Sequence, residues 1–260
     1  MLDQLDIEKL KEIARLAGDE ILQVYGSDFV VDEKEDESPL TEADRRANTV
    51  ILEELGKSYP GLPFVSEESK ALPFEERKQW PYLWMIDPLD GTKEFVKRNG
   101  EFTVNIALVR DGVPVAGVVY QPTEEKMYYA VEGRGAFVQI GQGSARPLTG
   151  GPSYRDPAVD PVKVVASRSH LSQEVTDFVK DLEQEGRQVE FMSSGSSLKL
   201  CLVAEGAAHV YPRLAPTMEW DTAAAHAVVR EAGKQVLQFE SGEDLRYNKE
   251  DLLNPWFVVE

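Results

Sequence analysis

The sequence predicts a mixed fold, part α+β and part α/β, arranged in two lobes. In the first part, two amphipathic helices precede a run of short apolar strands joined by tight turns, which is typical of an antiparallel meander. In the second part, strand and helix patterns alternate, which is typical of an α/β layer. Between them, residues 141–161 are rich in Gly, Pro and Ser. We therefore expect lobes at 1–150 and 151–260.

The first lobe begins with two helical patterns. Apolar residues recur at helical spacing over 2–24, before Gly26, and the acidic stretch 30–40 is interpreted as a loop. Thr41 opens the second helix, because residues 41–44 (TEAD) have the form of a capping box. Prolines at 60 and 63 precede a short strand that ends near Ser66. Further strands are expected at 83–86, 102–109, 113–120, 127–130 and 136–140, with a hairpin turn at Asp111–Gly112.

The elements of the second lobe are predicted from the same apolar patterns. No internal repeat is visible in the sequence. Its strands are expected at 162–167, 188–192, 208–211 and 236–239, and its helices at 173–185, 197–205 and 222–232.

Composition excludes several classes of function. The chain of 260 residues has 28 Lys and Arg against 46 Asp and Glu, a net charge of −18, which opposes binding to nucleic acid or an anionic membrane. The lone Cys201 allows no internal disulfide or thiolate cluster and is expected to be a buried, inert thiol. His209 and His226 are expected to be structural. No apolar run approaches the ~18 residues of a membrane span. We expect a cytoplasmic protein without stable membrane insertion, in which oxygen ligands hold any metal.

The most informative motif is the segment 87–92 (DPLDGT). Asp87 and Asp90 lie three positions apart directly after an expected buried strand, with Pro88 fixing the backbone between them. Gly91 permits a tight turn, and a helix that begins after it would direct free N–H groups toward an anion. Alternatively, the two carboxylates form only an Asx-type turn and a helix cap.

Two further carboxylates occupy similar junctions between strand and helix. Glu67 follows the strand that ends near Ser66, and Asp221 precedes an alanine-rich helix. Taken singly, Glu67 is interpreted as a surface acid and Asp221 as an N-cap. Together with the first motif they form an oxygen-only ligand set, which suits Mg²⁺.

The segments 87–92 and 220–224 (WDTAA), together with the order Glu67, Asp87, Asp90, Asp221, resemble the signatures of the inositol monophosphatase superfamily of lithium-sensitive, Mg²⁺-dependent phosphatases. The resemblance runs from about residue 5 to the C-terminus. Stretches 93–105, 167–170, 195–199 and 211–213 resemble one branch of it, the CysQ-type 3'(2'),5'-bisphosphate nucleotidases. Ala225 and Lys234 stand where the family usually has glycine, and neither is a proposed ligand.

The resemblance implies a layered α-β-α-β-α sandwich and a place in sulfur assimilation. It implies hydrolysis of the 3'-phosphate of adenosine 3',5'-bisphosphate to AMP and phosphate by metal-activated water, with the sulfated nucleotide as a second candidate substrate. It also implies a ligand set for two or three Mg²⁺ ions, namely Glu67, Asp87, the Leu89 carbonyl, Asp90 and Asp221. Thr92 and Asp44 would orient and deprotonate the water, with Glu67 as a further catalytic residue.

The resemblance also assigns the substrate-binding groups. The N–H groups of Gly91 and Thr92 would receive the scissile phosphate. The remaining assigned residues are Leu89, Asp90, Arg168, His170, Ser196, Lys199, Arg213 and Asp221. Lys93, Lys97 and Arg98 form a local basic island, although Lys97 and Arg98 are equally well interpreted as solvated surface charges.

Two other functions stay open at this point. An inositol monophosphatase or another sugar-phosphate phosphatase would share the fold and the metal site. A non-catalytic acidic protein that binds Ca²⁺ or a protein partner would explain the charge without chemistry. Monomer and homodimer are both open, as is peripheral contact with the inner membrane.

Overall fold

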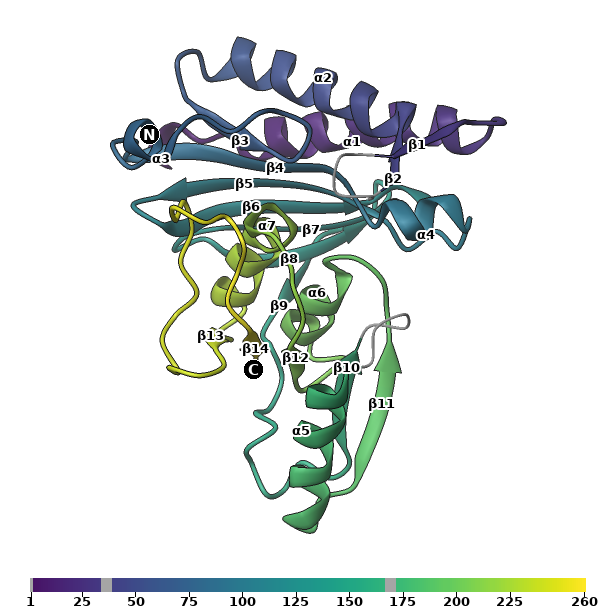
Figure 1. Cartoon of the computed structure of the whole chain (residues 1–260), viewed down its shortest axis with the longest axis vertical. Coiled ribbons are helices and arrows are strands. Elements are labelled where there is room, and N and C mark those ends of the chain that lie inside the picture. Colours follow the sequence, from purple (N-terminus) through teal and green to yellow (C-terminus); the bar gives the residue numbers. More distant parts are fainter. Residues whose placement is uncertain (1, 34–38, 167–171) are drawn as a thin grey trace.

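The computed structural model describes residues 2–33, 39–166 and 172–260. Its elements stack in layers (Figure 1), with α1 and α2 on one face of a large sheet and α7 on the other. The helices are α1 (Ile7–Tyr25), α2 (Glu42–Ser58), α3 (Phe74–Arg77), α4 (Thr92–Val96), α5 (Gln173–Gln184), α6 (Leu198–Glu205) and α7 (Glu219–Glu231), with short 3₁₀ helices η1 (Leu2–Gln4) and η2 (Pro122–Glu124).

The large sheet has seven strands in the order β3-β4-β5-β6-β7-β8-β9. They are β3 (Phe64–Ser66), β4 (Tyr82–Asp90), β5 (Thr103–Arg110), β6 (Val113–Gln121), β7 (Lys126–Val131), β8 (Gly135–Ile140) and β9 (Arg146–Leu148). β3 pairs in parallel with β4, and every later pair is antiparallel. The expected meander is therefore present, with positive φ at Asp111 and Gly112 in its first hairpin.

Side chains of β4 alternate between the two faces of this sheet, as the pleat requires. Trp84 and Ile86 belong to the core beneath α1 and α2. Leu83 and Met85 belong to the core shared with α6 and α7. The next residue in the second series is Asp87, so the alternation directs this carboxylate toward α7.

The helix α7 lies unusually close to the sheet, and Gly117 on β6 permits this. A Cβ atom built on Gly117 would lie 2.2 Å from the backbone oxygen of Ala224. The alanines of α7 add little side-chain bulk between the two backbones, and Ala223, Ala224 and Ala225 are all buried. Close packing of small residues thus fixes the height of the N-terminus of α7 above the sheet.

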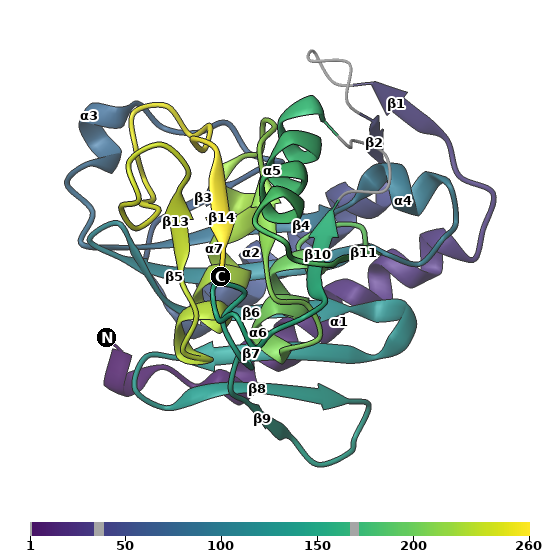
Figure 2. The same ribbon diagram turned by 90° about the horizontal axis from the view of Figure 1, so that it is seen from below.

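The remaining strands lie beyond α6 and α7 (Figure 2). They are β10 (Val162–Ala166), β11 (Val189–Ser193), β12 (Tyr211–Arg213), β13 (Val236–Gln238) and β14 (Phe257–Val259), with a small antiparallel pair β1 (Val31–Glu33) and β2 (Pro39–Thr41) elsewhere. β10 and β11 are parallel, and β14 lies between β12 and β13. The helix α5 packs on β10 as the outermost layer. The layered α-β-α-β-α sandwich is confirmed.

Three local predictions were wrong. The stretch 30–40 includes β1 and β2, whose backbones pair although acidic residues disfavour strands. The strand expected at 83–86 extends through Asp90, because β5 pairs with it as far as Thr103. The strand expected at 208–211 is shifted to Tyr211–Arg213, because its partner β14 pairs there.

The predicted division at residue 150 stays a prediction. No helix in the described ranges combines the length and apolar character needed to cross a membrane.

Candidate metal and phosphate site

Asp87 and Asp90 lie at the end of β4, where the strand leaves its regular pairing. The register with β5 shifts between these two residues, so the intervening backbone bulges out of the sheet. The Asp87 carboxylate accepts a hydrogen bond from Leu89 N at 3.1 Å. The Asx-type turn is therefore present, and it holds one carboxylate oxygen while the buried side chain faces its neighbours.

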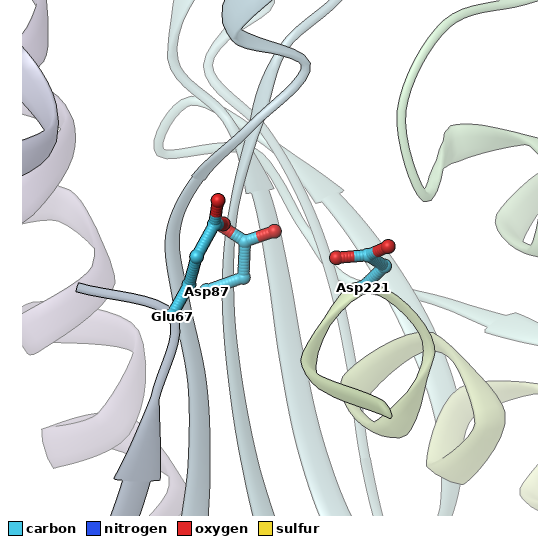
Figure 3. Close-up of side chains that lie close together, drawn as sticks. All are labelled: Glu67, Asp87 and Asp221. Atoms are coloured by element: carbon cyan, nitrogen blue, oxygen red, sulfur yellow. The ribbon is translucent and has the colours of Figure 1, made fainter. Parts of the chain in front are cut away.

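Glu67 reaches the same place through the parallel pair of strands. Its N–H donates to the carbonyl of Ile86 at 3.2 Å, so the residue after β3 is fixed next to Asp87. Figure 3 shows these two carboxylates side by side and Asp221 opposite them on α7. Ligand oxygens from all three residues lie within 4.8 Å of one another.

Asp221 is held by the first turn of α7, but the N-cap prediction for it was wrong. The helix begins at Glu219, and its N-cap is Met218. Asp221 is therefore the third helical residue, and its Oδ2 accepts from Met218 N at 2.9 Å and Thr217 Oγ1 at 2.7 Å. The carboxylate reaches back over the helix start, as in a capping box.

Burial and mutual repulsion set the electrostatics of this cluster. Desolvation raises the pKa of Asp87 well above its usual value, and the charges of Glu67, Asp90 and Asp221 raise it further. Desolvation, followed by the charges of Asp90 and Glu67, raises the pKa of Asp221 to about 7. Close carboxylates cannot all ionise without a compensating cation. The donor set therefore fits a divalent metal held by oxygen.

Thr92 and Asp44 lie beside this cluster. The Asp44 Oδ2 accepts from the N–H and the hydroxyl of Thr41, each at 2.7 Å, which confirms the predicted capping box. Its Oδ1 accepts from Thr92 Oγ1 at 3.3 Å. The Thr92 hydroxyl is equally far from the carbonyl of Leu89. One helix start thus presents a buried carboxylate to the start of another.

Gly91 has φ +92°, a left-handed conformation that favours glycine. A Cβ atom here would lie 3.1 Å from the backbone oxygen of Glu101 and 3.4 Å from Ser196 Cβ. Thr92 begins α4 directly after it, so the predicted helix start is present. A side chain at position 91 would therefore crowd Glu101 and Ser196.

A pocket extends from the acidic cluster toward two basic side chains. It is lined by Asp90, Ser196, Lys199, Arg213 and Asp221, among others. The Lys199 ammonium donates to the carbonyl of Ser196 at 2.5 Å and lies 5.6 Å from the centre of the Tyr211 ring. Burial, opposed by the charge of Asp90 and assisted by that of Arg213, lowers the pKa of Lys199 to about 8.

Arg213 donates one hydrogen bond to the carbonyl of Pro216 at 2.6 Å. Its Nε is buried and has no hydrogen-bond partner among the described residues. Sequence reasoning missed Glu94, which lines the same pocket, and Glu101, whose carboxylate accepts from Gly195 N at 2.8 Å. Both acids lie in the stretch 93–105 that resembles the nucleotidase branch, and this was the signal that could have found them.

The other predicted basic residues lie in different surroundings. Arg168 and His170 lie outside the described residues. Lys93 lines the pocket, whereas Arg98 is no freely solvated charge, because it donates to the carbonyls of Tyr25 and Ser27.

The other residues singled out by the sequence have structural surroundings. The buried His226 hydrogen-bonds Tyr247 Oη at 2.9 Å, and burial lowers its pKa to about 3. His209 Nδ1 accepts from the N–H of Lys163 at 2.9 Å. Cys201 is buried, which raises the pKa of its thiol.

Comparison with known proteins decides the family. The model of the inositol monophosphatase family matches residues 3–257. The chain belongs to this family. It is 46% identical to the 3'(2'),5'-bisphosphate nucleotidase CysQ of Salmonella typhimurium, covering 97% of this chain and 98% of that protein. The corresponding Escherichia coli K12 protein is 45% identical over the same shares.

Solved structures of the family agree with the fold. The CysQ structure from Bacteroides thetaiotaomicron has 48% identity and a TM-score of 0.84, covering 97% of this chain and 96% of that one. The suhB structure from Bartonella henselae has 26% identity and a TM-score of 0.77, covering 97% and 92%. This family member is thus similar to nucleotidases along nearly its whole length.

Proposed function

We propose that this protein is a Mg²⁺-dependent 3'(2'),5'-bisphosphate nucleotidase. It would hydrolyse the 3'-phosphate of adenosine 3',5'-bisphosphate to AMP and phosphate, and the sulfated nucleotide is a second candidate substrate. One observation carries the proposal: a pocket lined by the carboxylates and by Thr92, which contacts Asp44, adjoins a second pocket lined by Lys199 and Arg213, and the two share Asp90 and Asp221. The near full-length likeness to nucleotidases supports it.

Glu67, Asp87, Asp90, Asp221 and the Leu89 carbonyl would hold two or three Mg²⁺ ions. When bound, these ions would lower the pKa of the attacking water and stabilise the leaving oxygen. Their charge would also allow the close carboxylates to ionise together, which burial and repulsion otherwise oppose.

Thr92 and Asp44 would orient and deprotonate the water. A hydroxyl has a single proton, and Thr92 can donate it to the Asp44 carboxylate. The lone pairs of Thr92 Oγ1 are then free to accept from the water, and Asp44 is the base at the end of the pair. Thr41 holds the other oxygen of Asp44, so the carboxylate cannot rotate away.

The substrate would span the pocket between the two charged ends. The amides of Gly91 and Thr92 would bind the scissile phosphate, since the first N–H groups of a helix have no partners within it. Arg213 and Lys199 would bind the second phosphate, because a buried guanidinium nitrogen without a partner favours an anion. Ser196 lies between the two ends and would contact the nucleotide.

The direct test is phosphate release from adenosine 3',5'-bisphosphate by the purified protein. We expect turnover with Mg²⁺, loss of turnover with EDTA, recovery on adding Mg²⁺ back, and inhibition by lithium. Absence of phosphate release at saturating Mg²⁺ would refute the proposal, whereas insensitivity to lithium would count only against the nucleotidase branch. We place this reaction in the cytoplasm, and both monomer and homodimer are compatible with it.

A further inference from the structure

A buried hydrogen-bond network on β5 connects to the carboxylate of Asp90. Its Oδ2 accepts from Ser196 Oγ at 2.7 Å, Ser197 N at 2.6 Å and Asn105 Nδ2 at 3.4 Å. These donors occupy the acceptor capacity of this oxygen. Within the described part of the chain, no hydrogen bond reaches the other oxygen, Oδ1.

The direction of the network follows from counting its protons. Ser196 uses its one proton on Asp90, and Ser197 uses its own on Asn105. The hydroxyl of Thr103 lies 2.5 Å from Ser196 Oγ, 2.9 Å from Ser197 Oγ and 3.2 Å from Asn105 Oδ1, so its single proton is shared among these three oxygens and links the two branches. In the second branch, Ser197 Oγ donates to Asn105 Oδ1 at 2.9 Å. The amide oxygen can only accept, which leaves the Nδ2 end of Asn105 for Asp90. Both branches therefore end at the same carboxylate oxygen.

The network also holds a strained turn. Ser196 has φ +54°, a left-handed conformation that is costly for a residue with a side chain. Thr103 is fully buried, and Asn105 and Ser197 are nearly so, so their polar groups have no bulk water as an alternative partner. The carbonyl of Ser196 accepts from Lys199 Nζ. One turn thus joins Asp90 to the basic end of the pocket.

We propose that Thr103 and Asn105 are positioning residues for Asp90, fixing its Oδ2 through this network so that Oδ1 remains free for a cation. Neither residue lines the pocket in the described part of the chain, so they act through Ser196, Ser197 and Asp90. The inference rests on the metal-binding part of the proposed function. It does not depend on which phosphate ester is hydrolysed.

The test compares Thr103→Val with Thr103→Ser. Valine keeps the volume and removes the hydroxyl, whereas serine keeps the hydroxyl. The affinity for Mn²⁺, measured without substrate from the EPR signal of the free ion, should fall about tenfold in Thr103→Val, as is typical for partners of metal ligands. It should stay within about twofold of wild type in Thr103→Ser. In activity assays, the Mg²⁺ concentration for half-maximal rate should rise in parallel, with kcat largely restored at saturating Mg²⁺.

Unchanged Mn²⁺ affinity in a folded Thr103→Val protein would overturn the inference. If Thr103→Val does not fold, Asn105→Leu, of similar volume, removes the second branch and carries the same expectation. The outcome is separate from that of the proposed function. A protein that binds Mn²⁺ with these differences but does not hydrolyse the nucleotide would retain the inference and refute the function. A protein that hydrolyses the nucleotide but shows no change in Mn²⁺ affinity in Thr103→Val would retain the function and refute the inference.

Discussion

Thr92 Oγ1 lies 3.3 Å from Oδ1 of Asp44, although the two residues are 48 positions apart and belong to different helices. Thr92 is the first residue of α4, and Asp44 lies in the first turn of α2. The contact therefore joins the starts of two helices. The second oxygen of Asp44 is fixed by Thr41. The two contacts together fix both oxygens of the buried Asp44 carboxylate.

Thr92→Val should lower kcat by about 10²–10⁴-fold, the usual contribution of general acid–base catalysis. The hydroxyl is lost while the volume is kept, so KM for adenosine 3',5'-bisphosphate should change much less. Steady-state kinetics of the variant check this, with Thr92→Ser as the matched control that should retain most activity. A Thr92→Val enzyme with wild-type kcat would remove Thr92 and Asp44 from the catalytic pair.

Asp90→Asn should abolish most activity, with a loss of at least about 100-fold, while the fold is preserved. Asparagine keeps an oxygen that can accept from Ser196 and Ser197 but removes the charge offered to a cation. Phosphate release and circular dichroism together measure the outcome. The exposed Asp177→Asn on α5 is the control and should behave as wild type. Full activity in Asp90→Asn would refute the assignment of Asp90 as a metal ligand.

The effect of Mg²⁺ on thermal stability should depend on pH. The pKa of Asp221 rises from 3.8 to about 7 on folding, so between these values the folded state binds more protons than the unfolded state. Without metal, this group therefore makes the protein less stable as pH rises through that window. Mg²⁺ binds the ionised form, so the increase in Tm with Mg²⁺ should be larger at pH 8 than at pH 5.5.

Differential scanning calorimetry with EDTA or Mg²⁺ at both pH values tests this dependence. Asp221→Asn is the control, since it cannot titrate and should show a smaller difference between the two pH values. An equal Tm increase at both pH values in the wild type would contradict the assigned role of this cluster.

Arg213→Met should lower kcat/KM for adenosine 3',5'-bisphosphate by about 10–100-fold, because a charge-assisted hydrogen bond to the second phosphate is lost. For adenosine 3'-monophosphate, which lacks that phosphate, the change should be within about threefold. Comparing the two esters in one assay separates recognition from folding. The exposed Arg134→Met, whose guanidinium donates to the carbonyl of Leu2, should leave both values unchanged. Equal losses for both esters would place the second phosphate elsewhere.

The sequence predicted the carboxylates of the site because each follows a local signal. Asp87 and Asp90 follow the apolar segment 83–86, Glu67 follows 64–66, and the pleat of β4 directs Asp87 toward α7. Asp221 was predicted as a candidate ligand but misplaced within its helix. The N-cap of α7 is Met218, a residue type that is not preferred at this position, so the sequence did not indicate a helix start at Glu219.

The sequence did not predict the hydrogen-bond network around Asp90 or the strand β14, because both depend on contacts between segments that are distant in the chain. Thr103 and Asn105 look like ordinary polar residues of a strand, and only the 195–197 turn, more than 90 positions away, gives them a shared partner in Asp90. The strand β14 is the second example. It forms between β12 and β13 only after the C-terminal segment folds back.

The most direct measurement is the ratio of kcat/KM for adenosine 3',5'-bisphosphate to that for inositol 1-phosphate, both at saturating Mg²⁺. The basic end of the pocket would bind a second phosphate that only the nucleotide carries, so we expect a preference of at least about 100-fold for the nucleotide. A ratio at or below one would contradict the nucleotidase assignment and identify a sugar-phosphate phosphatase of the same family.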